Sequence, residues 1–295
     1  KLIRDKKEKE IYESNTGIKL FSEDNDKNFM EFFEETAQQK QDYNYTVSFN
    51  YFNEFINKGS FLFSELTRDI CLKYKDYLLK LPIKAHTAHH YFVTFKAVIN
   101  LAVLSELIDR NPANRICIKY DDPKIEFLTI TEVKELIEKP CKFPQIKNGF
   151  LFSTFSGLRR SDLNKISFKD IKEKHLYFRQ KKTRETVRIK LNTIALGIIK
   201  EQKKVMKRDR IFSIPTGGRL TQRFREWINS KSINQKITFH CSRHTFGTLL
   251  AAKGENVYTI MKLMGHKNIK TTMKYLHIVD SRKDEAIDLL DEYFE

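Results

Sequence analysis

The chain has 295 residues, a length that two domains of ordinary size would fill. It carries 54 Lys and Arg against 38 Asp and Glu, a formal net charge of +16, so we expect a polyanionic partner such as nucleic acid. No run of about 18 apolar residues predicts a membrane span, no N-terminal segment has the pattern of a secretory signal, and four scattered cysteines favour a reduced intracellular protein over a disulfide framework.

The first part of the chain predicts a helical domain. Residues 1–27 are dense in charged side chains, and we interpret them as an extension outside any core. From residue 28 to 115, apolar residues recur every three or four positions, the spacing of helices that bury one face. The clearest stripes are Phe49, Phe52 and Ile56, then residues 70–81, and then residues 91–102. We therefore expect residues 28–115 to form an all-helical domain.

Residues 116–128 differ in pattern from what precedes and follows them. They have no helical period and contain Pro123, so we predict an interdomain linker there. A new helix is expected to begin directly afterwards, capped by the hydroxyl of Thr129 or of Thr131.

The remaining residues, 129–295, mix two kinds of periodicity. Residues 176–180 and 186–191 are β-rich and flank a polar segment, which predicts a β-hairpin, while the rest returns to helical spacing. The predicted fold is therefore mainly α with a small antiparallel sheet, in which an all-helical domain precedes an α+β domain.

Short clusters of polar residues after residue 150 point to chemistry. Arg159 follows an apolar helix face and Gly157, an arrangement that alone indicates only a surface arginine. His240 and Arg243 lie one helical turn apart and point the same way, and Gly247 beneath them is expected to leave room for a bulky ligand. His266 follows a glycine that is expected to end a helix.

A metal site is the competing interpretation of the histidines. His240 and His244 have i, i+4 spacing, but the third ligand and the glutamate of H-E-x-x-H are missing from the motif. We therefore expect no metal and no cofactor.

In order, the clusters read G-L-R, a lysine-bearing hairpin, H-x-x-R-H, L-M-G-H, and a tyrosine nine residues after that histidine. This combination resembles the tyrosine recombinase, or phage integrase, family over residues 85–295. The resemblance implies an enzyme that cuts and rejoins DNA through a 3′-phosphotyrosyl intermediate without ATP or metal. It also implies that residues 28–115 are a core-binding domain, that residues 129–295 are the catalytic domain with a C-terminal helix, and that residues 1–27 are a remnant of, or linker to, an upstream arm-binding domain.

The resemblance assigns a role to each matching residue. The catalytic set is Arg159, Lys182, His240, Arg243, His266 and Tyr275, with Asp162 in a supporting role. Tyr275 is the nucleophile in this assignment, and the two arginines bind the phosphate oxygens, because guanidinium groups pair with such oxygens and keep their charge. Lys182 protonates the leaving 5′-oxygen. Lys181 is the alternative for that role.

The DNA-binding surface is less sharply defined by the sequence. The candidate contacts are Lys84, His86, Thr87, His89, His90, Lys96, Arg160, Lys181 and Arg223. For the three histidines, a solvated helix start is the competing interpretation, and a basic run at residues 203–210 is open to the same two interpretations.

The expected partners also follow from the resemblance. They are double-stranded DNA with inverted core sites, three further copies of the chain in a tetramer on synapsed DNA, and accessory DNA-bending proteins. The C-terminal helix, predicted from a capping box at Ser281 and an apolar stripe after it, would dock in trans. We expect a cytoplasmic, nucleoid-associated bacterial recombinase of a mobile element. The alternatives are a non-catalytic architectural DNA-binding protein and a type IB topoisomerase, and the complete catalytic set favours an enzyme.

Overall fold

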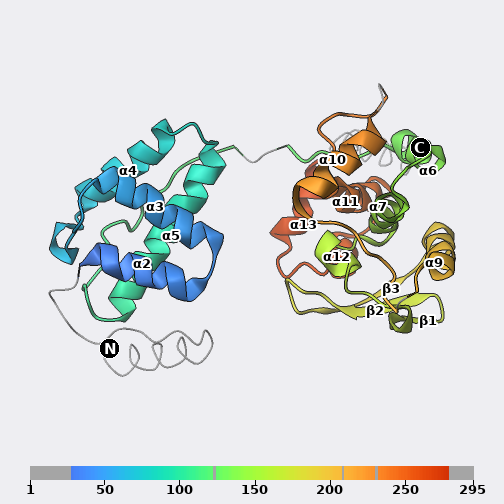
Figure 1. Ribbon diagram of the computed structural model, residues 1–295, viewed down its shortest axis with the longest axis horizontal. Coiled ribbons are helices and arrows are strands. Elements are labelled where there is room, and N and C mark those ends of the chain that lie inside the picture. Colours follow the sequence, from blue (N-terminus) through green and yellow to red (C-terminus); the bar gives the residue numbers. More distant parts are fainter. Residues whose placement is uncertain (1–27, 122–123, 208, 230–231, 279–295) are drawn as a thin grey trace, which may run out of the picture. The chain divides into compact units, whose positions relative to one another are not determined.

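The computed structural model describes residues 28–121, 124–207, 209–229 and 232–278. The chain divides after Pro123 into two compact units, each with its own core (Figure 1). This boundary lies inside the predicted linker. Ile116 and Ile118, at the start of that segment, pack in the first core, and Leu128 at its end packs in the second. The stretch outside both cores is therefore shorter than residues 116–128.

Among its described residues, the regular elements of the first unit are helices, joined by turns and irregular segments. Its elements are α2 (Phe29–Lys40), α3 (Tyr43–Ile56), the 3-10 turn η1 (Phe63–Glu65), α4 (Arg68–Lys80) and α5 (Ala85–Leu104). Three of the helices begin at a side chain that accepts a hydrogen bond from the first turn, which satisfies a backbone donor that the helix leaves unpaired. These caps are Asn28, Asp42 and Thr67.

Aromatic rings fill the core of the first unit. The ring centroid of Phe52 lies 5.4 Å from that of Phe29, 5.0 Å from that of Tyr74 and 4.9 Å from that of Phe95. The four residues come from four different helices and are fully buried. Aromatic pairs at such distances add about 0.5–1.5 kcal/mol each beyond the burial of their surface. The predicted helical stripes thus meet in one core.

The second unit combines helices with one small sheet. Its helices are α6 (Ile130–Glu138), α7 (Pro144–Ser156), α8 (Arg160–Leu163), α9 (Thr193–Val205), α10 (Gly217–Ile228), α11 (Cys241–Ala252), α12 (Val257–Met264) and α13 (Lys270–Ile278), with the 3-10 turn η2 (Phe168–Asp170) before the sheet. Thr129 caps α6 in a reciprocal capping box with Glu132, which decides between the two predicted caps.

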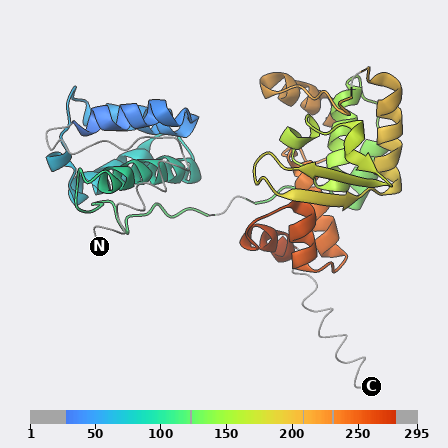
Figure 2. The ribbon, with the colours of Figure 1, turned by 90° about the horizontal axis from the view of Figure 1, so that it is seen from below.

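The sheet confirms the predicted hairpin. Strands β1 (Ile171–Lys172), β2 (His175–Arg179) and β3 (Thr186–Lys190) are antiparallel in the order β1-β2-β3, and β3 packs beside α12 (Figure 2). In the register, Leu176 pairs with Ile189, and both side chains are buried. Alternate residues point outward, as expected of a sheet with one buried face.

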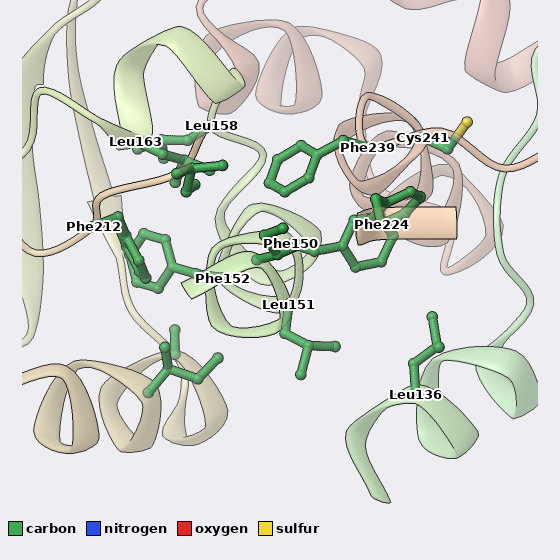
Figure 3. Packing of buried hydrophobic residues seen from close by; sticks show 14 of the residues in the cluster. Leu136, Phe150, Leu151, Phe152, Leu158, Leu163, Phe212, Phe224, Phe239 and Cys241 are labelled. Carbon is green, nitrogen blue, oxygen red and sulfur yellow. The ribbon is translucent and has the colours of Figure 1, made fainter. Parts of the chain in front are cut away.

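Helix α7 runs through the core of the second unit. The ring of Phe150 packs against Phe224 and Phe239 on one side, while Phe152 packs against Phe212 on the other (Figure 3). Helices α12 and α13 pack against the far end of α11 around a smaller apolar cluster that includes the ring of Tyr275. Among the residues that the structure describes, no helix combines the length and apolarity needed to cross a membrane.

Candidate active site

Two arginines from different elements meet at the C-terminal end of α7. The helix ends at Gly157, whose φ of +69° lets the chain reverse, and Arg159 follows as the cap of α8. Arg243 is in the first turn of α11 and is only 2% exposed. Its guanidinium donates hydrogen bonds to the carbonyl oxygen of Gly157 and, at 2.6 Å, to that of Met264. Arg243 thus ties α7 to the end of α12.

Burial and neighbouring charges shift the pKa values of both guanidinium groups. Burial, and then the charge of Arg159, lower the pKa of Arg243 to about 9, so it stays cationic at neutral pH. Burial likewise lowers the pKa of Arg159, and the carboxylate of Asp162 acts in the opposite direction. Two neighbouring cations, one buried and one partly buried, are costly without a paired anion, so a phosphate at this place would be bound strongly.

Tyr275 lies beside these arginines on α13. Its side chain is 3% exposed, and its hydroxyl oxygen is 3.1 Å from Nδ1 of His244. Burial raises the pKa of Tyr275, while the charges of Arg243 and Arg159 oppose the shift. The two cations favour the ionised phenol, but burial outweighs them, so the phenol stays protonated at neutral pH.

The space beside Gly247 is filled by other residues of the chain, and not by a ligand as we had expected. A Cβ atom at Gly247 would lie 2.9 Å from the ring of Tyr275 and 3.1 Å from Sδ of Met264. The glycine therefore makes room for the tyrosine ring, and the expectation that it accommodates a ligand is wrong. Gly247 is four residues after Arg243 in α11, so the ring of Tyr275 packs one helical turn beyond that arginine.

The histidines of the predicted set are held as neutral rings. His266 is 8% exposed, and its Nδ1 is 2.9 Å from the hydroxyl of Thr272. Burial and the charge of Arg243 lower the pKa of His266 to about 3. Because Thr272 occupies Nδ1, Nε2 is the nitrogen left to contact a ligand.

His240 lies at the start of α11, with its side chain exposed. Partial desolvation and the charges of the two arginines lower the pKa of its imidazole. Lys182 contributes in the same direction, which indicates that its ammonium group is near the imidazole. Lys182 is exposed on the hairpin tip, as is Lys181, whose backbone N–H donates to Asp162 at 3.0 Å. The structure thus brings the hairpin, both arginines and His240 together.

Three residues of this site were missed by the sequence analysis. His244 holds the hydroxyl of Tyr275, Thr272 holds His266, and Gln180 bonds to Arg159. His244 stands next to Arg243 in the H-x-x-R-H motif, so its position was a usable signal. Gln180 carries no comparable signal, because Arg159 and Met264 are distant from it in the sequence, and Thr272, six residues after His266, belongs to none of the recognised motifs.

Among the candidate DNA contacts, the side chains of Lys96 and His89 lie within hydrogen-bond distance of backbone carbonyls. Lys96 Nζ donates to the carbonyl of Ile116 at 2.9 Å, and His89 Nδ1 is 3.0 Å from the carbonyl oxygen of Ile118. Both therefore fasten the segment that leaves the first core. Lys84 and His90 are exposed, and His86 and Thr87 are partly buried.

The remaining candidates for DNA contact belong to the second unit. Arg223 is exposed on α10, and its guanidinium lies 4.9 Å from the ring centroid of Phe143. Arg160 opens α8 directly after Arg159 and is partly buried, and Lys181 is exposed. No group of three or more metal-ligating side chains that could hold an ion occurs among the described residues.

The sequence also matches two established protein-family patterns. Residues 126–282 match the Phage integrase family, and residues 27–120 match the Phage integrase SAM-like domain. The fold and the site define a tyrosine recombinase, an enzyme that cuts and rejoins DNA strands. The chain belongs to the phage integrase family.

Individual relatives cover much of the chain. A tyrosine recombinase of Thermosipho africanus is 27% identical over 212 residues, which span 68% of this chain and 75% of the relative. The tyrosine recombinase XerC of Natranaerobius thermophilus is 23% identical over 287 residues, which span 87% of this chain and 96% of the relative.

Solved structures share the fold at lower identity. The Tn1549 transposon integrase in complex with transposon right end DNA has a TM-score of 0.68 at 16% identity and covers 89% of this chain and 100% of its own. A lambda integrase dimer bound to a core site has a TM-score of 0.66 at 16% identity, covering 85% of this chain and 77% of its own. These likenesses confirm the predicted fold class.

Proposed function

We propose that this enzyme performs site-specific recombination through a 3′-phosphotyrosyl intermediate on Tyr275, in the service of a mobile element. One observation carries the proposal: the hydroxyl of Tyr275 is hydrogen-bonded to His244 in a site where both arginines act electrostatically on the phenol. The likeness to the integrase of a transposon supports the mobile-element role.

The chemistry follows from the charges of the site. As the phenolic oxygen attacks phosphorus, negative charge grows on the two non-bridging oxygens, where Arg159 and Arg243 donate hydrogen bonds. Removing one such preorganised donor typically costs about 10²–10³ in rate. The neutral ring of His266 supports the same oxygens through Nε2. The phenolic proton passes to Nδ1 of His244, which lies 3.1 Å from the phenolic oxygen, while His240 donates a hydrogen bond to the phosphate.

The leaving group requires a proton. When the bond between phosphorus and the 5′-oxygen breaks, the ammonium group of Lys182 delivers that proton and leaves a free 5′-hydroxyl. The new phosphotyrosyl ester retains the energy of the broken phosphodiester, so a second 5′-hydroxyl can attack it and reverse the step without ATP. Lys182 then takes the proton back.

The partners belong to the same proposal. We infer that the first unit is the core-binding domain and that the substrate is duplex DNA with inverted core sites, bound within the bacterial nucleoid. A lambda integrase tetramer bound to a Holliday junction supports a tetramer on synapsed DNA. Docking of the C-terminal helix in trans, and accessory DNA-bending proteins, complete the proposed complex. The predicted helix after Ser281 and the extension at residues 1–27 lie outside the described residues.

The decisive experiment traps the covalent intermediate. Duplexes that the protein selects from a random library would be nicked close to the cut site, so that the short 5′-end diffuses away after cleavage. We expect a protein–DNA band on a denaturing gel with the wild type and none with Tyr275→Phe, while both proteins bind the intact duplex equally.

The two alternatives give different outcomes in this assay. Binding without any covalent band on the selected duplexes would indicate a non-catalytic DNA-binding protein. Relaxation of supercoiled plasmid that lacks the selected site would indicate a topoisomerase, since a topoisomerase needs no paired sites.

A further inference from the structure

Gln180 is a buried amide in the active site that the proposed chemistry does not use. It follows β2 directly, opens the segment that carries Lys182, and is 2% exposed. Its backbone also closes the hairpin: its N–H donates to the carbonyl of Glu185 at 2.9 Å, and its carbonyl accepts from the N–H of Arg184 at 3.0 Å. The side chain is therefore set at the base of the hairpin tip.

The side-chain amide joins three elements. Its Oε1 accepts a hydrogen bond from Nη1 of Arg159 and a second one, at 2.9 Å, from the hydroxyl of Thr183 on the hairpin tip. Its Nε2 donates to the carbonyl of Met264, at the end of α12, at 3.0 Å. Gln180 thus connects the first arginine, the lysine-bearing hairpin and the loop that carries His266.

A neutral amide meets the demands of these partners. A guanidinium can only donate hydrogen bonds, and a backbone carbonyl can only accept them, so the group between Arg159 and Met264 must accept on one side and donate on the other. A carboxylate would lack the donor, and it would neutralise part of the charge of Arg159. A hydrocarbon side chain would leave Arg159 and Met264 without these hydrogen bonds, at a buried place where unpaired polar groups are costly.

The same carbonyl also anchors the second arginine. Nη2 of Arg243 donates to the carbonyl oxygen of Met264 at 2.6 Å. The same oxygen therefore holds both arginines, Arg243 directly and Arg159 through Gln180. Gly265 accommodates this arrangement, because a Cβ atom there would lie 2.6 Å from Cδ of Gln180. The spacing of the two cations therefore depends on the amide.

We propose that Gln180 is a positioning residue, which fixes the guanidinium of Arg159 relative to that of Arg243 and aligns the Lys182 hairpin with both. This inference rests on the proposed function and deepens it. Gln180 itself touches neither the phosphate nor the nucleophile in this proposal. It acts through the groups that do.

The test compares three variants in single-turnover cleavage with saturating protein. Gln180→Ala removes the amide, and Gln180→Glu keeps an acceptor but loses the donor. Both should cleave about 10²-fold more slowly, since misplacement of a reacting group by about 1 Å costs a factor of that order. Gln202→Ala is the matched control: Gln202 is an equally buried glutamine of the same unit that bonds to Gln145 instead. It should cleave like the wild type.

Modified substrates separate positioning from a general loss of structure. A methylphosphonate at the scissile position carries no negative charge and relies less on Arg159, and a bridging 5′-sulfur leaves without a proton from Lys182. We expect the defect of Gln180→Ala to shrink at least tenfold on the methylphosphonate and to shrink partly on the sulfur substrate. An equal defect on all three substrates would overturn the proposal, as would wild-type cleavage by both Gln180 variants.

Two controls keep the outcome interpretable. If Gln180→Ala does not fold, Gln180→Glu alone decides, and its thermal midpoint and DNA affinity should match those of the wild type. A wild-type protein that forms no covalent complex would defeat the proposed function itself. A wild-type protein that forms it, together with unimpaired Gln180 variants, would defeat only the role of Gln180.

Discussion

At the scale of single residues, the site is dominated by two cations, the buried Arg243 and the partly buried Arg159. Within the described part of the chain, neither Arg159 nor Arg243 forms an ion pair with a carboxylate, although Asp162 is near enough to raise the pKa of both. Their hydrogen-bond partners are the amide of Gln180 and two backbone carbonyls. Neutral partners hold a guanidinium in place without cancelling its charge, which leaves that charge available to an anion.

Neutral histidines make the second unit sensitive to acid. The folded pKa values of His244 and His266 are lowered to about 4 and about 3, whereas an unfolded chain titrates near 6.5. Below pH ~6.5 the unfolded state therefore binds protons that the folded state refuses, and stability falls by up to about 1.4 kcal/mol per pH unit for each ring. We expect urea unfolding to shift to lower urea between pH 7 and pH 5.

The fluorescence of Trp227 reports this transition, because it is the single tryptophan and is buried in the core of the second unit. The shift should be smaller in His266→Asn, which cannot titrate at that position. An identical shift in the variant and the wild type would contradict the assignment of acid sensitivity to this ring.

The sequence motifs predicted which residues lie together better than they predicted the hydrogen-bond partners of those residues. Arg159, Arg243, His266 and Tyr275 stand in local motifs whose spacing is visible without a structure. Gln180 acquires its contacts from residues 21 positions before it and 84 after it, which no local pattern encodes. The direction of Gly247 toward Tyr275 likewise depends on how α13 packs on α11.

At the scale of elements, the hairpin between β2 and β3 determines which lysine lies near His240. Lys181 and Lys182 are adjacent and both exposed, but only Lys182 influences the pKa of His240. We expect Lys182→Ala to slow cleavage of an ordinary phosphodiester by about 10²–10⁴, the usual contribution of general acid catalysis. A substrate with a bridging 5′-sulfur should restore most of the rate.

Lys181→Ala is the matched variant for this prediction. It removes the same charge one residue away, while its backbone bond to Asp162 remains. Near-normal cleavage by Lys181→Ala would support the assignment. If Lys181→Ala were instead the variant that sulfur rescues, the roles of the two lysines would have to be exchanged.

The contact between α11 and α13 determines the position of the ring of Tyr275. A methyl group at Gly247 would meet the ring of Tyr275 at 2.9 Å, so Gly247→Ala should displace that ring from its place beside the arginines. We expect the rate of covalent complex formation to fall by about 10²-fold, since small misplacements of a nucleophile have effects of that size. DNA affinity should stay near the wild-type value.

Gly197→Ala provides the comparison in another helix of the same unit. Gly197 lies inside α9, and nothing is within 4 Å of a Cβ atom added there. Alanine stabilises an open helix position by roughly 1 kcal/mol relative to glycine. Normal cleavage by Gly247→Ala, with Gly197→Ala also active, would show that the ring is not held by this packing.

Element boundaries were predictable where side chains cap or break helices. Thr129 and Gly265 begin and end helices as their types suggest. The linker was predicted too long because Ile116 and Ile118 look like loop residues in sequence. They are buried by packing against the first core, which a periodicity argument over 13 positions does not detect.

At the scale of the whole molecule, charge determines how binding responds to salt. A net charge of +16 allows many phosphate contacts, each of which releases a condensed counterion. We expect the affinity for a selected duplex to fall by about 10³-fold or more between about 50 and 200 mM salt. A filter-binding or fluorescence titration at several salt concentrations gives the slope.

The salt titration has a control variant and an outcome that would contradict the prediction. Chloride tests the general electrostatic effect, and Tyr275→Phe should give the same slope as the wild type because it changes no charge at neutral pH. An affinity nearly independent of salt would contradict a binding surface built mainly on phosphate contacts.

The burial of Tyr275 has a consequence for chemical labelling. Reagents that nitrate or iodinate accessible phenols should modify Tyr43 and Tyr258 first, since these side chains are 75% and 60% exposed, whereas that of Tyr275 is 3% exposed. The rate of labelling at Tyr275 then measures how often α13 opens. Any ligand that loosens or tightens that helix would be registered as a faster or slower reaction at a single aromatic ring.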